Sequence, residues 1–234
     1  MGLTIHYDLH AAKAKSKEEA RLLVKKLHAR AKELPFQEIG NIFEAEGDQA
    51  DFEKVGKDHP NRWLLIQCGN YVDHGQRSYK VPPGWLIAFE TYPGEGSEPA
   101  NFGLTLPPKT FKVDGKNVRT KLEAFTWGSF CKTQYASNPK YGGVANFLKC
   151  HLSIVALLDY AKEIGILREV SDEGQFWEKR DVKALAENVG EWNNMIASVF
   201  GQLKDSFGVD QLVGAIQSFQ NFEHLEAAGA SKRP

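Results

Sequence analysis

The fold is decided by residues 127–151, which read WGSFCKTQYASNPKYGGVANFLKCH. Residues 127–135 form a strand-like run, and the chain then turns at Asn138-Pro139. The Gly142-Gly143 pair leads into a helix expected from Val144 to Ile164, whose middle is apolar on all sides and therefore typical of a buried helix. Because a buried helix needs a sheet to cover, this stretch predicts strands and helices packed in one α+β domain.

Working outward, the N-terminal residues predict a strand and an amphipathic helix. Residues 3–9 alternate between apolar and polar side chains, the period of a strand with one buried face. Ser16 begins a capping segment, and an apolar stripe with helical spacing follows until Pro35. This helix is expected to pack on the sheet.

Between these regions the sequence predicts mainly strands. Residues 38–45 form a weak candidate strand, and the acidic segment 46–60 has the composition of a loop. The apolar runs 63–68 and 85–89 lack alternation, which is typical of central strands that are covered on both faces. Asp114-Gly115 predicts a hairpin, because this pair accepts positive φ at both centres of a type I′ turn.

The C-terminal third predicts a short strand at 167–170 and a helix at about 181–206. The expected fold is a single α+β domain over residues 1–226 with a mixed, mostly antiparallel sheet in the N-terminal two-thirds. An amphipathic N-terminal helix and two long C-terminal helices would cover this sheet. Residues 227–234 have nothing to bury and are expected to form a disordered tail.

The composition excludes arguments based on whole-molecule charge. With 42% hydrophobic residues, 25% charged residues and a formal net charge of −1, nothing favours a nucleic-acid or membrane partner for the molecule as a whole. Three cysteines without a CxxC pair, and no leader or spanning segment, predict a cytoplasmic protein with reduced thiols. Its oligomeric state does not follow from the sequence.

Cys131 and His151 are candidate catalytic residues. A thiol becomes a nucleophile when a nearby base or helix N-terminus stabilises the thiolate, and the strand-turn-helix order allows this pair to meet. Glu223 or Glu226 would then orient the histidine. The alternative is a buried cysteine and a hydrogen-bonded core histidine, since His151 shares a row with apolar residues.

The strand-to-helix junction is the candidate ligand site. Backbone amides after the glycine pair would bind an anion, and aromatic side chains would rim a pocket. The candidate ligand-binding residues are Lys132, Gln134, Tyr135, Lys140, Gly142, Gly143 and Trp177. The alternative is ordinary turn chemistry, because no phosphate-loop spacing accompanies the glycines.

Three polar surfaces offer further alternatives. Arg21, Lys25 and Lys32 lie with His28 on the polar face of the first helix, where nucleic acid or an acidic partner would bind unless the row is simply solvated. The acidic segment after residue 43 would instead pair with a basic partner or with this helix. On the first strand, residues 6, 8 and 10 alternate as His, Asp and His, a pattern that a metal or a solvated strand face explains.

The sequence favours a binding or regulatory protein with a small-molecule or protein partner at residues 127–151. The alternatives are a cysteine-dependent hydrolase or transferase and a nucleic-acid or acidic-partner binder. No metal or cofactor is predicted.

Overall fold

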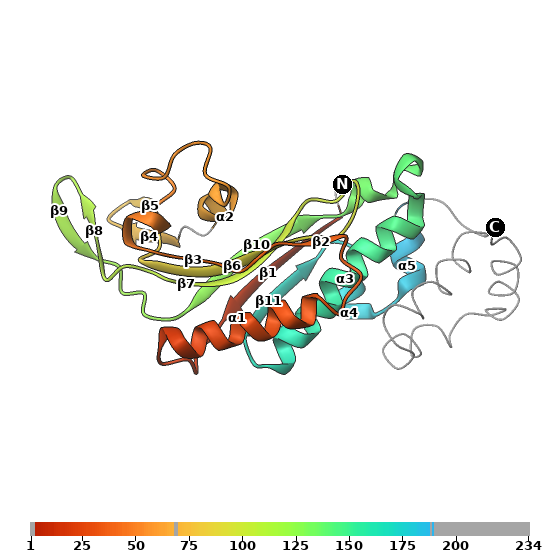
Figure 1. Ribbon diagram of the computed structural model, residues 1–234, viewed down its shortest axis with the longest axis horizontal. Helices are drawn as coiled ribbons and strands as arrows, with labels where there is room; N and C mark the ends of the chain where they lie inside the picture. Colours follow the sequence, from red (N-terminus) through yellow and green to blue (C-terminus); the bar gives the residue numbers. More distant parts are fainter. Residues whose placement is uncertain (1–2, 68–69, 188, 190–234) are drawn as a thin grey trace, which may run out of the picture.

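The computed structural model describes residues 3–67, 70–187 and 189 of the chain. In this part an antiparallel sheet is built from seven strands: β1 (Thr4–His10), β2 (Glu38–Ile39), β3 (Phe43–Glu46), β6 (Trp85–Tyr92), β7 (Ala100–Leu106), β10 (Thr126–Lys132) and β11 (Leu167–Asp172). Their order is β11-β1-β10-β7-β6-β2, and β3 also pairs with β6 (Figure 1). Strands far apart in the sequence therefore lie side by side.

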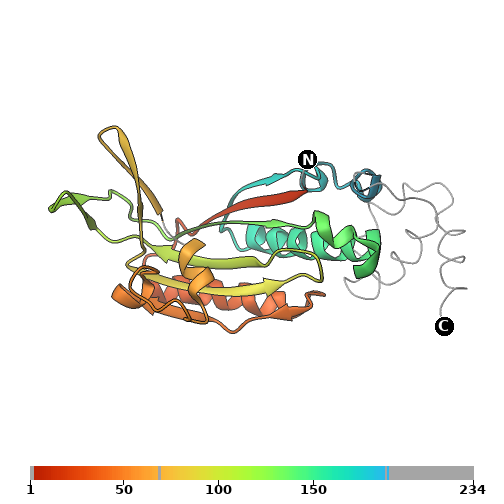
Figure 2. The same cartoon turned by 90° about the horizontal axis from the view of Figure 1, so that it is seen from above.

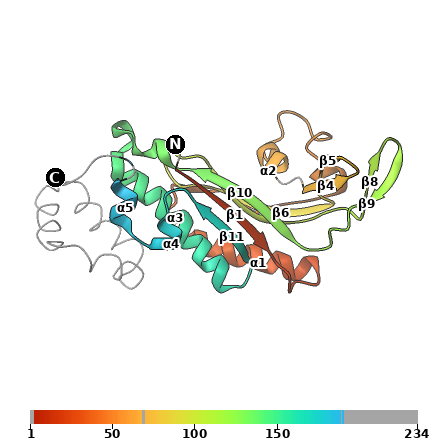
Figure 3. The ribbon, with the colours of Figure 1, turned by 180° about the vertical axis from the view of Figure 1, so that it is seen from behind.

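Two helices cover one face of this sheet. Helix α1 (Lys17–Ala31) contacts β6, β7 and the long helix α3 (Gly143–Glu163), and Figure 3 shows both helices beside the strands. The Ser16 side chain accepts a hydrogen bond from the Glu19 amide and caps α1. By length and composition alone α3 could cross a membrane, but 72% of its apolar window is buried within the fold, as in a core helix.

The opposite face is covered over only part of its width. Helix α2 (Arg62–Gln67) lies against β6, and the hairpin of β4 (Asn70–His74) and β5 (Arg77–Val81) lies beside it. Strands β6 and β7 are consequently buried on both faces, whereas outward-facing side chains of β1, β10 and β11 are exposed. An open strand face therefore lies beside a covered one.

The remaining elements lie at the two ends of the sheet. The hairpin of β8 (Thr110–Val113) and β9 (Lys116–Arg119) extends from one end. The short helices α4 (Phe176–Lys179) and α5 (Val182–Glu187) follow β11 toward the other end and lie alongside α3 (Figure 2). Two 3₁₀ turns, η2 (Gln134–Ser137) and η3 (Pro139–Tyr141), connect β10 to α3, and a third, η1 (Gly47–Ala50), follows β3.

Several expectations from the sequence are confirmed. The fold is α+β, and the strand pairs of the described sheet are antiparallel where the sequence predicts a mixed, mostly antiparallel sheet. The first strand buries alternate residues from Ile5 to Leu9, although Thr4 is also buried, and residues 85–89 form a strand covered on both faces. Asp114 and Gly115 have φ values of 49° and 77°, as the predicted hairpin turn requires. The long buried helix lies within one residue of its predicted bounds.

Three expected elements are wrong in type or extent. Residues 62–67 form helix α2, in which Leu64 and Leu65 are buried while Trp63 is 53% exposed, because a short apolar run suits a helix as well as a strand. The expected strand 38–45 is two strands, β2 and β3, separated by a break at residues 40–42. Strand β10 ends at Lys132 because residues 134–137 turn into a 3₁₀ helix.

The second long C-terminal helix is not confirmed. Residues 176–179 and 182–187 form two short helices, and Asp181 caps the second of them through its carboxylate and the Ala184 amide. The remainder of that expected helix, the tail 227–234, and the candidate acids Glu223 and Glu226 lie outside the described residues. The domain boundary at 226 stays a prediction.

Candidate functional site

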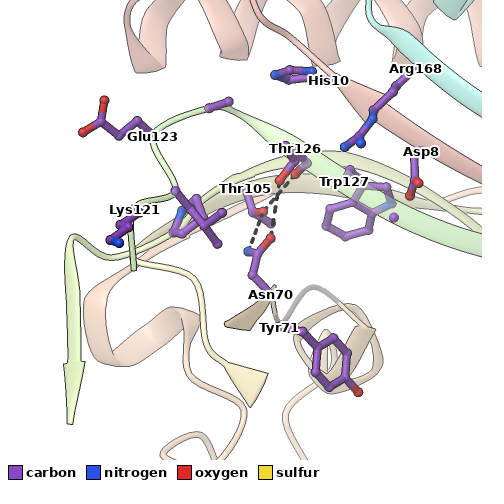
Figure 4. A pocket seen from close by; sticks show the side chains of 14 residues that line it. Asp8, His10, Asn70, Tyr71, Thr105, Lys121, Glu123, Thr126, Trp127 and Arg168 are labelled. Atoms are coloured by element: carbon purple, nitrogen blue, oxygen red, sulfur yellow. Dashed lines mark hydrogen bonds between the residues drawn. The ribbon is translucent and has the colours of Figure 1, made fainter. Parts of the chain in front are cut away.

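A cavity of about 600 Å³ lies where the open face of β1 and β10 meets the β4–β5 hairpin (Figure 4). We call it the Arg168 cavity. It is lined by Asp8, His10, Asn70, Tyr71, Thr105, Pro107, Lys121, Leu122, Glu123, Ala124, Thr126, Trp127, Gly128 and Arg168. Five separate segments of the chain thus contribute to one hollow.

The floor of the Arg168 cavity is held by hydrogen bonds between strands. The Thr105 hydroxyl donates to the Thr126 carbonyl at 2.9 Å, in the one residue pair that joins β7 to β10 as a ladder within the described part of the chain. The Asn70 side chain lies within 3.5 Å of both threonine hydroxyls and ties β4 to this seam. The Trp127 indole donates to the Asn101 carbonyl at 2.8 Å, which fixes the ring.

The rim of the Arg168 cavity carries charges of both signs. Figure 4 shows the Arg168 guanidinium above Thr126 and Trp127, between His10 and Asp8, with Lys121 and Glu123 at another edge. Within the described residues, the side chains of Arg168 and Asp8 form no ion pair or hydrogen bond. Both charges are therefore available to a ligand.

Two residues at the rim of the Arg168 cavity are unusual, one in the exposure of its side chain and one in its backbone conformation. Tyr71 projects from β4 with 70% of its surface exposed, although an aromatic ring of this size is usually half-buried or more. Lys121 has a φ of 57°, a left-handed conformation that costs energy for a residue other than glycine. Backbone strain of this kind is common at ligand-binding sites, and of the four such residues in the described part of the chain Lys121 is the one that lines this cavity.

His151 belongs to a buried polar network on the other side of the sheet. Its Nδ1 lies 3.0 Å from the Thr133 hydroxyl and its Nε2 lies 3.1 Å from the Asp172 carboxylate. That carboxylate also accepts hydrogen bonds from the Gly174 and Trp177 amides. The network therefore fastens α3 to β11 and to the start of α4.

The pKa of Asp172 is lowered although its carboxyl group is buried. Burial by itself raises the pKa, but the hydrogen bond and charge interaction with His151 and the two amide hydrogen bonds lower it further than burial raises it. Asp172 is thus an ionised, fully hydrogen-bonded group, which is typical of a structural role.

Cys131 has a different set of contacts from His151. Its thiol donates to the Glu98 carbonyl at 2.9 Å, whereas both nitrogens of His151 are engaged by Thr133 and Asp172. Burial raises the pKa of the Cys131 thiol well above its usual range, and nearby Cys150 and Glu98 raise it further. Burial also raises the pKa of Cys150, to about 11. These environments disfavour a thiolate nucleophile at neutral pH.

Both buried thiols are expected to resist alkylation in the native protein. At pH 8 iodoacetamide should leave Cys131 and Cys150 largely unmodified, because the thiolate is the reactive species and little of it forms. In urea both should react at the rate of an ordinary cysteine. Peptide mass spectrometry over a pH series measures this, and rapid native labelling of Cys131 would favour the hydrolase hypothesis instead.

The residues of the expected junction site are distributed over separate contacts. Lys132 lies 4.9 Å from the centre of the Tyr135 ring, and Lys140 lies 4.4 Å from the centre of the Tyr141 ring. Gly142 has a φ of 104° at the start of α3, where the backbone requires a glycine, and Gly143 is buried. Gln134 begins the η2 turn.

Trp177 and Asn146 have structural partners at different places along α3, with Trp177 beside Lys162 in the C-terminal half of the helix and Asn146 at the junction. The Trp177 ring packs against the Arg180 guanidinium, which lies 4.6 Å from its centre. Asn146, which no sequence pattern singles out, donates to the Glu95 and Ala136 carbonyls and fastens the loop at 93–99 to the junction. Among the candidate ligand-binding residues, Lys132 and Tyr135 are thus the only two whose side chains contact each other in the described part of the chain.

The basic row on α1 is partly paired within the chain. Arg21 forms two hydrogen bonds with the Glu44 carboxylate, and Lys17 pairs with Glu46, so the acidic segment pairs with the helix as one alternative expected. Lys25 and Lys32 remain exposed. The charge that this face offers to nucleic acid is reduced accordingly.

No group of three His, Cys, Asp or Glu side chains within the described residues is placed to hold a metal ion. Comparisons with known proteins found no matching family model, no similar curated protein and no similar solved structure. The kind of ligand therefore follows only from the residues of the cavity.

The sequence by itself points to part of this cavity. It indicates the polar face of β1 and the start of β10, but no pattern in it singles out Arg168, Asn70, Tyr71 or Lys121. These four residues are brought together by tertiary contacts and share no spacing motif. The local signals in the sequence are an arginine within a short predicted strand and an asparagine-tyrosine pair.

Proposed function

We propose that this protein is a non-catalytic binding protein whose ligand occupies the Arg168 cavity. One observation supports this proposal most. Arg168 and Asp8, two charged side chains without an ion-pair partner in the described residues, lie at the rim of a cavity whose floor is held by hydrogen bonds. The site shares Trp127 and Gly128 with the region that the sequence favours. A cytoplasmic location with reduced thiols remains part of this proposal.

The ligand should be a small molecule with an anionic group and a flat or apolar body. A guanidinium offers paired donors that match a carboxylate, phosphate or sulfonate. Tyr71, Leu122 and Pro107 supply apolar surface at the wall of the cavity. Cysteine chemistry is less well supported, because both described thiols are buried and have raised pKa values.

An aromatic sulfonate tests this proposal. 8-Anilinonaphthalene-1-sulfonate should bind the native protein at one site, and Arg168→Gln should weaken its binding roughly tenfold, because a charge-assisted hydrogen bond is lost. Fluorescence titration gives both dissociation constants. Arg77→Gln is the matched control, since Arg77 is exposed on β5 and does not line the cavity.

Near-ultraviolet circular dichroism should show that each variant keeps native packing, because loosely packed states also bind this dye. Equal affinities for the unmodified protein and Arg168→Gln, or no binding at all, would contradict the proposed site.

A further inference from the structure

A second cavity continues the Arg168 cavity along the open face of the sheet. It has a volume of about 350 Å³ and is lined by His6, Tyr7, Asp8, Gly128, Ser129, Phe130, Glu169 and Ser171. We call it the Glu169 cavity. Asp8 and Gly128 line both cavities, so the two adjoin at these residues on the open face.

Gly128 contributes no side chain to the boundary between the two cavities. It pairs with Asp8 across the β1–β10 ladder, and a side chain on it would project onto the open face. A Cβ atom at Gly128 would lie 2.9 Å from the Asp8 carboxylate oxygen and would meet nothing else within 4 Å. A larger residue there would therefore fill the floor between the cavities and displace the Asp8 side chain.

The two cavities differ in charge. Arg168 and Lys121 both line the first cavity, whereas no lysine or arginine lines the second. In the second, Asp8 and Glu169 are direct partners in the β1–β11 ladder, so their side chains lie next to each other on the same face. Neither carboxylate forms an ion pair within the described residues.

An exposed aromatic ring completes the Glu169 cavity. Phe130 is 42% exposed, and its ring centre lies 5.7 Å from that of His6. An aromatic face beside two carboxylates attracts an ammonium group through both charge and the ring quadrupole. The length also fits an extended ligand, since the four residue steps from His10 to His6 span about 13 Å at the rise of a β-strand.

We infer that the ligand is an elongated zwitterion. Its anionic end lies at Arg168, its chain crosses Gly128, and its cationic end lies between Asp8 and Glu169 beside Phe130. This inference rests on the proposed binding function and adds the class of ligand.

Three eight-carbon chains that differ only at one end test the inference by competition with the bound dye. 8-Aminooctanoate carries an ammonium group at the far end, octanoate a methyl group and octanedioate a second carboxylate. 8-Aminooctanoate should displace the dye at a concentration at least about fivefold lower than octanedioate, because the far end meets two carboxylates.

Glu169→Gln should reduce this preference to about twofold or less, since one of the two carboxylates is then neutral. The matched control is Glu163→Gln, an exposed glutamate on α3 that lines neither cavity and should leave the preference unchanged. Gly128→Val should weaken 8-aminooctanoate more than the short anion butanoate, which needs the Arg168 cavity alone.

The outcomes separate the two proposals. If Arg168→Gln weakens the dye but Glu169→Gln leaves the preference unchanged, or octanedioate competes as well as 8-aminooctanoate, the zwitterion is wrong and the binding site stands. If Arg168→Gln has no effect on the dye, both proposals fall.

Discussion

Replacing Asp172 with alanine should lower the free energy of unfolding by about 3–5 kcal/mol, because His151 and two backbone amides then lose their shared buried acceptor. Urea denaturation measures the loss. Asp159→Ala is the matched control: Asp159 forms two hydrogen bonds with Arg180, but both side chains are 41% exposed, so the cost should be at most about 1 kcal/mol.

The contribution of Asp172 should also depend on pH in a defined direction. Its pKa is lower in the folded protein than in the unfolded chain, where the pKa of an aspartate is about 3.9. The stabilisation is therefore fully present above that pH and is lost as the pH falls through the folded pKa. The stability difference between the unmodified protein and Asp172→Asn should consequently narrow below about pH 4. A difference that widens in acid would contradict this account.

The second large effect is expected in the aromatic core. Phe102 is fully buried on β7 and stacks between Tyr7 and Phe89, with ring centres 4.9 Å and 5.9 Å away. Phe102→Ala should cost about 3–5 kcal/mol, because the surrounding strands cannot close the space that the ring leaves. Thermal and urea unfolding both report this loss.

Phe130→Ala provides the comparison within the same sheet. This ring lies on the open face and is 42% exposed, so its removal should cost about 1 kcal/mol or less. If the two substitutions cost the same, the open face of β10 would have to be buried in the native protein. The comparison therefore tests the assignment of the two faces as well as the core.

Local pattern was sufficient where one face of an element is buried. Residues 5–9 bury every second side chain because a strand presents alternate residues to the core. The Asp114-Gly115 turn was predictable for the same local reason, since few residue pairs accept two positive φ values. The prediction of a strand at 63–68 was wrong, because a six-residue apolar run has no periodicity that separates a helix from a strand, and residues 62–67 form α2.

The candidate site was less predictable than the elements that carry it. The polar face of β1 was visible in the sequence, but its neighbours depend on strand order. Arg168 and Glu169 reach this face only because β11 returns beside β1 after helix α3. Asn70 and Tyr71 reach it only because the β4–β5 hairpin lies over the seam between β7 and β10.

The amino-acid sequence by itself determined the α+β class, the buried helix at 143–163 and the alternation that gives β1 an exposed polar face. These properties depend on periods of two or 3.6 residues, which neighbouring residues set. Tertiary structure alone decided that His151 binds Thr133 and Asp172 while Cys131 binds the Glu98 carbonyl. It also decided that Arg168, Asp8 and Gly128 meet at one hollow, because contacts between distant segments follow from strand order and packing.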